Sequence, residues 1–258
     1  GRGRVGMRGG VAGAGRGGLM AAGELAGAGQ KVLVVEAKPS VARKLLMAGK
    51  SGLNLTKDEP FDQLIANYGD AADWLAPMVT DFDAQAVKTW ARDLGIDLFT
   101  GSTARVFPTV MKASPLLRAW LGQLDSQGVQ RQTRWRWTGW DGEALVFQSP
   151  DGEQRITGGV TVLALGGASW ARLGSDGQWA TVLQDRAVEL APFKPANAGL
   201  VIEWSDPMAG QFGAPVTGNA LRAGGLAARG GAATFTPRPG GGGNHVVRPR
   251  QRGRGRGG

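Results

Sequence analysis

The hydrophobic and polar positions of the first forty residues predict a glycine-rich turn, a helix and a buried strand, in that order. Residues 19–28 have the composition of a helix, and Gly29 is suited to end it. Residues 31–35, KVLVV, form a short apolar run with β-branched side chains, which is typical of a buried parallel strand. In front of the turn, an arginine and two glycines at 8–10 stand where a buried strand needs branched apolar residues. Either that first strand is very short or this end of the sequence is damaged.

Helical periodicity dominates the next part of the chain, where helices are predicted near 61–68, 72–79 and 84–94. A fourth helix is predicted to begin at Ser114-Pro115, an N-cap followed by proline at the first helical position, and to run to about residue 127. Apolar residues form a stripe on each of the last two helices. The stripe of the third helix contains Ala86, Val87, Trp90 and Leu94. That of the fourth contains Leu116, Leu117, Trp120, Leu121 and Leu124.

Strands are predicted to follow, at 130–140, 144–149 and 153–157, with hairpin turns at Asp141-Gly142 and at Pro150-Asp151-Gly152. Residues 160–165, VTVLAL, predict another buried strand that stops at Gly166-Gly167. Residues 176–187 favour a helix, and residues 199–204 favour a strand. Because helices and strands alternate, we expect an α/β fold with an antiparallel insertion.

Net charge is concentrated at the two ends of the 258-residue chain. The formal charge is +9, yet residues 1–18 and 229–258 together hold eleven arginines and no acid, which leaves residues 19–228 at −2. Ends so rich in glycine and arginine bury little apolar surface, so we expect them to be disordered. The predicted organisation is a disordered start (1–10), a Rossmann-type nucleotide-binding domain (11–192), the start of a β-rich inserted domain (193–232) and a disordered tail (233–258).

Composition also limits the chemistry. The chain has no cysteine, which excludes disulfides and cysteine nucleophiles, and its single histidine, His245, lies in the glycine-rich tail. A histidine-based triad or a zinc site is therefore a poor hypothesis, and an enzyme of this composition would take its chemistry from a cofactor. No apolar run approaches a membrane span, and the N-terminus lacks the pattern of a signal peptide, so we expect a cytoplasmic protein without membrane contact.

Three glycines, Gly13, Gly15 and Gly18, fit the G-x-G-x-x-G pattern of a dinucleotide-binding turn. The first two allow a tight turn and close approach to phosphate, and the third lets the helix pack against the strand. Glu36 follows the next predicted strand, where a carboxylate would accept hydrogen bonds from ribose hydroxyls. In a chain with 44 glycines the glycine pattern alone is weak, but its combination with Glu36 favours a dinucleotide site.

Two other patterns have competing interpretations. The Trp135-Arg136-Trp137 alternation is compatible with stacking of nucleic-acid bases, but strand alternation, with the indoles packed on one side, explains it at lower cost. With a nearly neutral central region, we expect nucleic-acid contact only from the arginine-rich ends, if at all. Ser175-Asp176 could cap a helix or present a polar group to a cofactor, and capping is the commoner role.

Three longer segments carry a more specific resemblance. They are EAKPSVARKLLMAGKSGLNLT (36–56), TGSTARVFPTVMKASPLLRAWL (100–121) and VLALGGASWARLGSDGQW (162–179). In this order they resemble the BaiN/YhiN-type, aminoacetone-oxidase-like flavoprotein family, over residues 11–228. The resemblance implies FAD bound to a two-dinucleotide-type Rossmann domain with a β-rich insertion, and an oxidoreductase that acts on a small organic substrate, with NAD(P)H as a candidate reductant.

The resemblance also implies which residues hold the cofactor. Gly13, Gly15 and Gly18 would hold the FAD pyrophosphate, and Glu36 the adenosine ribose. The remaining candidates would lie near the phosphates and the flavin: Arg43, Lys44, Gly49, Lys50, Ser51, Asn54, Gly166 and Gly167. Arginine and lysine can neutralise phosphate, and glycines let backbone N–H groups approach it. The catalytic residues are left unassigned.

Family members are considerably longer than this chain, and the match fades near residue 230, where glycine, arginine and proline take over. We therefore expect a chain truncated by a frameshift, with an incomplete flavin site. Two alternatives to the flavoprotein hypothesis are an NAD(P)-dependent dehydrogenase that uses the same turn and a nucleic-acid-binding protein with arginine- and glycine-rich tails.

Overall fold

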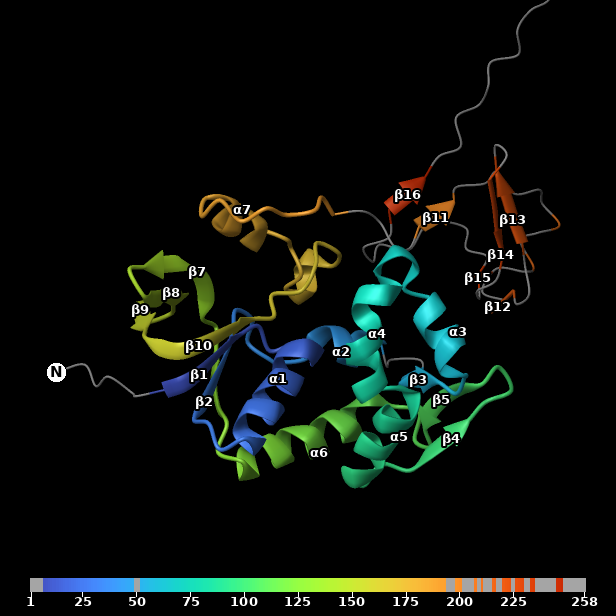
Figure 1. Cartoon of the computed structure of the whole chain (residues 1–258), viewed down its shortest axis with the longest axis horizontal. Helices are drawn as coiled ribbons and strands as arrows, with labels where there is room; N and C mark the ends of the chain where they lie inside the picture. The colour runs from blue at the N-terminus through green and yellow to red at the C-terminus, as the bar shows by residue number, and fades with distance from the viewer. Residues whose placement is uncertain are drawn as a thin grey trace, which may run out of the picture.

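The computed structural model describes residues 7–48 and 52–193 and, beyond them, residues 207 and 210 and six short strands. Its centre is a four-stranded parallel sheet in the order β10-β1-β2-β6 (Figure 1). The strands are β1 (Met7–Ala12), β2 (Val32–Glu36), β6 (Gln130–Thr133) and β10 (Gly158–Leu163). β1 lies between β2 and β10, so the strands that follow it in the chain are added to the sheet on both of its sides. This is the Rossmann-type arrangement predicted from the sequence.

Helices α1 (Arg16–Gly27) and α6 (Ala113–Ser126) cover one face of this sheet. Leu19 of α1 and Leu116 and Leu124 of α6 are almost fully buried with Val11 and Val34 of the sheet. The predicted stripe of α6 is confirmed, since four of its five residues are buried and Leu121 packs against them. The larger hydrophobic core therefore lies between the sheet and these two helices.

The opposite face is covered by a second, antiparallel sheet in the order β7-β8-β9 and by helix α7 (Trp179–Gln184). Its strands are β7 (Arg136–Asp141), β8 (Ala144–Ser149) and β9 (Gly152–Ile156). Phe147 and Trp137 are buried against Leu33 and Val35 of β2, and Trp135 packs on the same cluster. The packing interpretation of the two tryptophans is thereby confirmed.

The remaining described elements extend from the Rossmann unit. Residues 43–108 supply helices α2 (Arg43–Ala48), α3 (Phe61–Ala66), α4 (Ala72–Asp81) and α5 (Ala84–Asp93), the short turn η1 (Gly69–Ala71), and strands β3 (Thr56–Lys57), β4 (Leu98–Thr100) and β5 (Arg105–Pro108). A further turn, η2 (Ala171–Leu173), precedes α7. Beyond residue 193 the described strands are β11 (Ala198–Leu200), β12 (Pro215–Val216), β13 (Ala220–Ala223), β14 (Leu226–Arg229), β15 (Ala233–Thr234) and β16 (His245–Val247).

Several predicted boundaries differ from the structure. The strand expected at 130–140 is two strands in two different sheets, because Arg134 has a φ of 64° and turns the chain out of the parallel sheet. Trp135 then donates its backbone N–H to the Glu36 carbonyl at 3.0 Å, which fixes the start of the second sheet. The strand at 160–165 was expected to be buried, but β10 is an edge strand and Val160 is 59% exposed.

The strand in front of the glycine turn is longer than its composition predicts. β1 pairs with β2 and β10 over most of its length, and it includes residues 7–10 of the expected disordered start. Gly9 and Gly10 are tolerated because their neighbours fill the space: a Cβ built on Gly9 would meet Leu25 at 3.5 Å, and one on Gly10 would meet Thr161 at 3.7 Å. The predicted N-cap of α6 is wrong, because the N-cap position is Lys112 rather than Ser114. Of the two roles considered for Ser175-Asp176, capping is not found, since the N-cap position of α7 is Gln178.

The predicted domain boundaries remain predictions. The strand expected at 199–204 corresponds to β11, and residues 201–204 lie outside the described residues. Most of the predicted tail, 233–258, also lies outside them. Among the described residues, no helix is both long and apolar enough to cross a membrane.

Replacing Leu124 by alanine is expected to lower the free energy of unfolding by about 3 kcal/mol, because it opens a cavity between α6 and α1. The Leu124 side chain is fully buried and meets Gly23 of α1. Denaturant unfolding followed by tryptophan fluorescence measures the loss. Met78→Ala, at a half-exposed side chain of α4, is the control and should change the free energy by about 0.5 kcal/mol or less. Equal losses in the two variants would contradict this assignment of the core.

A second prediction concerns Lys88, a buried cation that the sequence pattern missed on α5. Its ammonium donates a hydrogen bond to Asp58 at 2.9 Å, and this bond, with the positive charge behind it, lowers the pKa of the Asp58 carboxyl. A carboxyl with a lower pKa in the folded state stabilises the fold above its unfolded pKa of about 3.9 and loses that contribution as pH falls through the folded pKa. Urea unfolding followed from pH 7 down to about pH 2 should therefore show a smaller fall in the free energy of unfolding in Asp58→Asn than in the parent chain. Asp81→Asn, at an exposed position of α4, should keep the parent's pH dependence.

Candidate functional site

The carboxyl ends of β1, β2 and β10 border a cavity of about 570 Å³. Its walls come from the glycine turn, the end of β2, the start of α2, the start of β7 and the segment that follows β10. In open α/β sheets, ligands bind at this edge, where neighbouring connections leave in opposite directions. A volume of this size is typical of small-molecule and cofactor sites.

The glycine turn has the geometry that its three glycines predict. Gly13 has a φ of 103°, and a Cβ on it would overlap the carbonyl oxygen of Ala164. A Cβ on Gly18 would overlap the carbonyl oxygen of Gly13. Gly15 differs from both, because a Cβ there would meet nothing within 4 Å. Gly13 and Gly18 are thus required by the fold, whereas Gly15 leaves open space beside the cavity.

Helix α1 begins directly after this turn and presents free donors. Its first intrahelical hydrogen bond runs from the Leu19 N–H to the Gly15 carbonyl at 3.0 Å, which leaves the amides of residues 16–18 without an intrahelical acceptor. The N-cap, Gly15, makes no side-chain hydrogen bond, and the first turn contains no acid. This end of α1 therefore favours an anion, by its free N–H groups and its partial positive charge.

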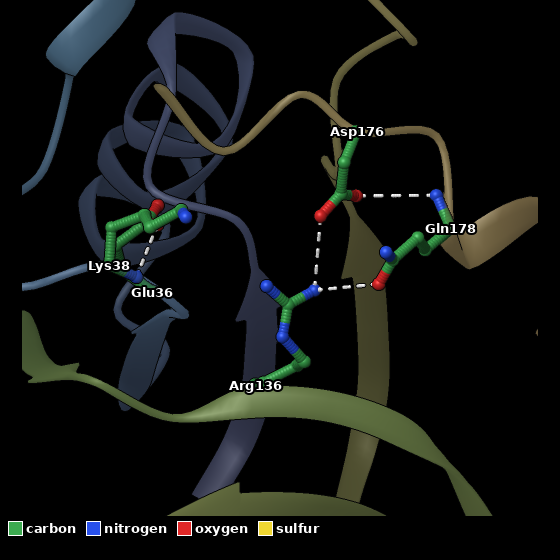
Figure 2. Close-up of polar contacts among 5 residues, drawn as sticks. All are labelled: Glu36, Lys38, Arg136, Asp176 and Gln178. Atoms are coloured by element: carbon green, nitrogen blue, oxygen red, sulfur yellow. Dashed lines mark hydrogen bonds and ion pairs between the residues drawn. The ribbon is translucent and has the colours of Figure 1, made fainter. Parts of the chain in front are cut away.

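Glu36 lies beside the turn, as predicted. One carboxylate oxygen accepts the Ala14 N–H at 3.0 Å. The other accepts the Lys38 N–H at 2.9 Å, as Figure 2 shows. The two bonds hold the carboxylate at the cavity wall and use one acceptor position on each oxygen. Since a carboxylate has about four such positions, Glu36 can still accept hydrogen bonds from hydroxyls of a ligand.

A segment from Ala164 to Gln178, which we call the crossing segment, runs across this edge of the sheet. It starts at the end of β10, where Ala164 donates its N–H to the Ala12 carbonyl at 2.7 Å. It then reaches the end of β2, where a Cβ on Gly174 would lie 3.3 Å from the Lys38 side chain. Because it passes the glycine turn between these two points, the crossing segment forms one wall of the cavity.

Arg43 and Lys44 line the cavity and contact the crossing segment. Arg43 donates to the Arg172 carbonyl at 3.4 Å, and Lys44 donates to the hydroxyls of Ser175 at 3.2 Å and Ser169 at 3.5 Å. In the described part of the chain neither side chain pairs with a carboxylate. The cavity therefore carries positive charge that a ligand can neutralise.

The crossing segment is joined to β7 by an ion pair that sequence reasoning did not predict. Arg136 of β7 reaches Asp176 at 3.3 Å and Gln178 at 3.5 Å, and Asp176 also accepts the Gln178 N–H at 3.2 Å (Figure 2). The bond joins the antiparallel sheet to the crossing segment. Arg136 and Asp176 are 40 positions apart, and the sequence contains no signal that pairs them. The one available hint is that each is predicted to lie near the end of a strand or helix.

The structure brings together six of the twelve predicted site residues, and these line the cavity: Gly13, Gly15, Glu36, Arg43, Lys44 and Gly166. Gly18 supports the turn from behind. Gly167 is not part of the lining, and Asn54 is exposed and also apart from it. Gly49, Lys50 and Ser51 lie outside the described residues. Ser175, which sequence reasoning assigned mainly to capping, is a buried partner of Lys44.

The described residues contain no group of three or more histidine, cysteine, aspartate or glutamate side chains placed to hold a metal ion. No curated protein sequence matches the chain significantly.

Solved structures resemble the chain at low identity. One is THI4 from Thermovibrio ammonificans, at 14% identity and a TM-score of 0.47, over 77% of this chain and 69% of that protein. Another is a 3-ketosteroid dehydrogenase from Rhodococcus jostii, at 18% identity and a TM-score of 0.44, over 62% of this chain and 46% of that protein. A flavocytochrome c3 fumarate reductase has 22% identity and a TM-score of 0.46, over 62% of this chain and 34% of its own. This chain thus spans less than half the length of the last two.

A match to a family model is far more specific than these resemblances to solved structures. The model described as the HI0933-like protein Rossmann domain matches residues 9–245, which is most of the chain. It confirms the resemblance that the three sequence segments carry, and its limits include most of β1, the glycine turn and the crossing segment. The chain belongs to the HI0933-like Rossmann-domain family, the BaiN/YhiN-type family of FAD-binding flavoproteins.

Proposed function

We propose that this chain is an FAD-dependent oxidoreductase, or the part of one that holds the nucleotide end of FAD, and that it acts on a small organic substrate. The observation that carries the proposal is the glycine turn at the cavity edge, where free amides of α1 and an open Gly15 lie next to the Glu36 carboxylate. Family membership supports the same cofactor. FAD supplies the transfer of hydride or electrons when it is bound.

The cavity residues fit this group chemically. The open space beside Gly15 would admit a phosphate to the amides of α1, where the helix favours negative charge. Glu36, held by two backbone amides, would accept hydroxyls of the adenosine ribose. Arg43 and Lys44 would lie near the phosphates and make the cavity wall positive, and Gly166 would let the backbone pass close to the cofactor. A role for Gly49, Lys50, Ser51, Asn54 and Gly167 near the flavin stays a prediction.

An NAD(P)-dependent dehydrogenase is the second candidate, since the same turn and carboxylate would hold a nicotinamide dinucleotide. NAD(P)H is also a candidate reductant of a bound flavin. We further propose a cytoplasmic location. We also propose that the chain has no specific nucleic-acid partner, because the charge of residues 19–228 is nearly neutral.

The first test is the visible spectrum and the melting temperature of the purified chain. If FAD binds, the protein should show flavin absorption, or acquire it on reconstitution, and added FAD should raise the melting temperature because only the folded state binds it. NAD and NADP serve as the comparison ligands. A rise with NAD or NADP and none with FAD would reject the flavoprotein proposal in favour of the dehydrogenase.

Replacing Gly15 by alanine is expected to weaken FAD binding by about tenfold or more, whereas the free energy of unfolding of the FAD-free protein should fall by only about 1 kcal/mol, because alanine is a poorer N-cap than glycine. The reason is that the new methyl group enters the open space reserved for phosphate and touches no protein atom within 4 Å. Gly122→Ala is the matched control, since a Cβ at Gly122 also meets nothing within 4 Å and this exposed residue of α6 does not line the cavity. Fluorescence titration measures both affinities. Unchanged FAD affinity in Gly15→Ala would contradict phosphate binding at this turn.

Glu36→Gln tests the ribose assignment. It removes the charge and one of the two acceptor sites for backbone amides, so we expect FAD affinity to fall about tenfold. FMN lacks the adenosine, so its affinity should change little, and this comparison separates a local contact from a general loss of structure. Glu24→Gln, at an exposed position of α1, is the control. Equal losses for FAD and FMN would show that Glu36 acts only on the fold of the turn.

A further inference from the structure

Lys44 connects helix α2 to the crossing segment across more than 120 residues of sequence. Its ammonium group lies 3.2 Å from the Ser175 hydroxyl and 3.5 Å from that of Ser169, both of which can accept its protons. Ion pairs between the described residues do not include Lys44. The two serine hydroxyls are therefore the polar partners that direct this side chain.

Ser175 contacts both the Lys44 ammonium group and the backbone of Gly166. Its side chain is buried, at 4% exposure, and its hydroxyl lies 2.6 Å from where a Cβ of Gly166 would be. The hydroxyl therefore rests against the Gly166 Cα. On the other side, the Gly166 carbonyl accepts a hydrogen bond from the Trp179 indole at 2.9 Å. The peptide of Gly166, with a φ of 75°, is thus fixed between Ser175 and Trp179 at the cavity wall.

The conformation of the crossing segment needs such support. Trp170 has a φ of 89°, a left-handed conformation that is unfavourable for a residue with a side chain. Such a conformation persists only where the surrounding structure holds it. Lys44 contacts Ser169 on one side of Trp170, and Arg43 contacts the Arg172 carbonyl on the other. Both contacts come from the first turn of α2, whose entry is itself tied to the glycine turn by the Ala42 N–H and the Ala14 carbonyl at 2.8 Å.

We propose that Lys44 is a positioning residue for the cofactor, acting through Ser175 on the backbone of Gly166, rather than a direct ligand of the phosphates. This inference rests on the proposed function, in that the positioned backbone borders the cavity assigned to FAD. It predicts that Lys44 and Ser175 work as one unit. Removing either side chain should misplace Gly166 and weaken FAD binding. Removing the other side chain as well should then weaken FAD binding no further.

A double-mutant cycle in FAD affinity tests this unit. Lys44→Met keeps the unbranched side chain and removes the donor, and Ser175→Ala removes the acceptor while leaving the charge of Lys44 in place. We expect each variant to weaken FAD binding by about tenfold and the double variant by about the same factor, because coupled residues are not additive. Lys31→Met, at the opposite edge of the sheet, controls for the loss of one positive charge and should bind FAD like the parent.

Two results would overturn the proposal. If Lys44→Met weakens FAD binding and Ser175→Ala does not, Lys44 touches the cofactor directly. If the two losses multiply to about a hundredfold in the double variant, the residues act independently. A parent chain that binds no FAD would instead reject the proposed function.

Hydrogen exchange in the FAD-free protein gives a readout that does not depend on the cofactor. If Lys44 holds the crossing segment, amides between residues 166 and 175 should exchange about tenfold faster in Lys44→Met and in Ser175→Ala, while those of α6 stay unchanged. A lysine that serves only as a phosphate ligand would leave these amides as they are in the parent. Exchange at α6 also reports whether each variant is folded, so a general loss of stability is recognised as such.

Discussion

The close packing at Gly13 is the constraint on which the rest of the site depends. At this residue the ends of three neighbouring strands meet: its N–H donates to the Val35 carbonyl at 2.8 Å, and its Cα faces the carbonyl of Ala164. On the helix side, Gly18 of α1 packs directly against the carbonyl of Gly13. A methyl group on either glycine would displace backbone, which cannot move without breaking the hydrogen bonds of the sheet. The turn is thus held rigidly, and with it the first amides of α1.

Charge around the cavity follows from the same arrangement. The Glu36 carboxylate is balanced by two backbone amides rather than by a cation, and Arg136 is balanced by Asp176. Arg43 and Lys44 are directed by uncharged oxygens. Together with the positive end of α1, these two cations leave the cavity suited to a ligand that carries about two negative charges, as a diphosphate does.

The antiparallel sheet also belongs to the site, although it is a separate sheet. The left-handed turn at Arg134 carries the chain from β6 onto the other face of the parallel sheet, where β7 to β9 shield β1 and β2 from solvent. Residues 135–138, at the start of β7, then form a wall of the cavity. The insertion therefore stabilises the Rossmann unit and shapes its ligand site at once, because burial of the indoles positions the arginine between them.

The sequence by itself determined the local features: the glycine turn, the helix behind it, the strand that ends at Glu36, and the apolar stripe of α6. Each of these is encoded within a few residues, by side-chain periodicity or by backbone conformations that only glycine adopts easily. Only the tertiary structure decided that residues 130–140 enter two sheets, that Lys44 meets Ser175 and that Arg136 meets Asp176. These contacts join residues 40 and 131 positions apart, and their partners are selected by how the strands are ordered in space, which no local pattern of residues records.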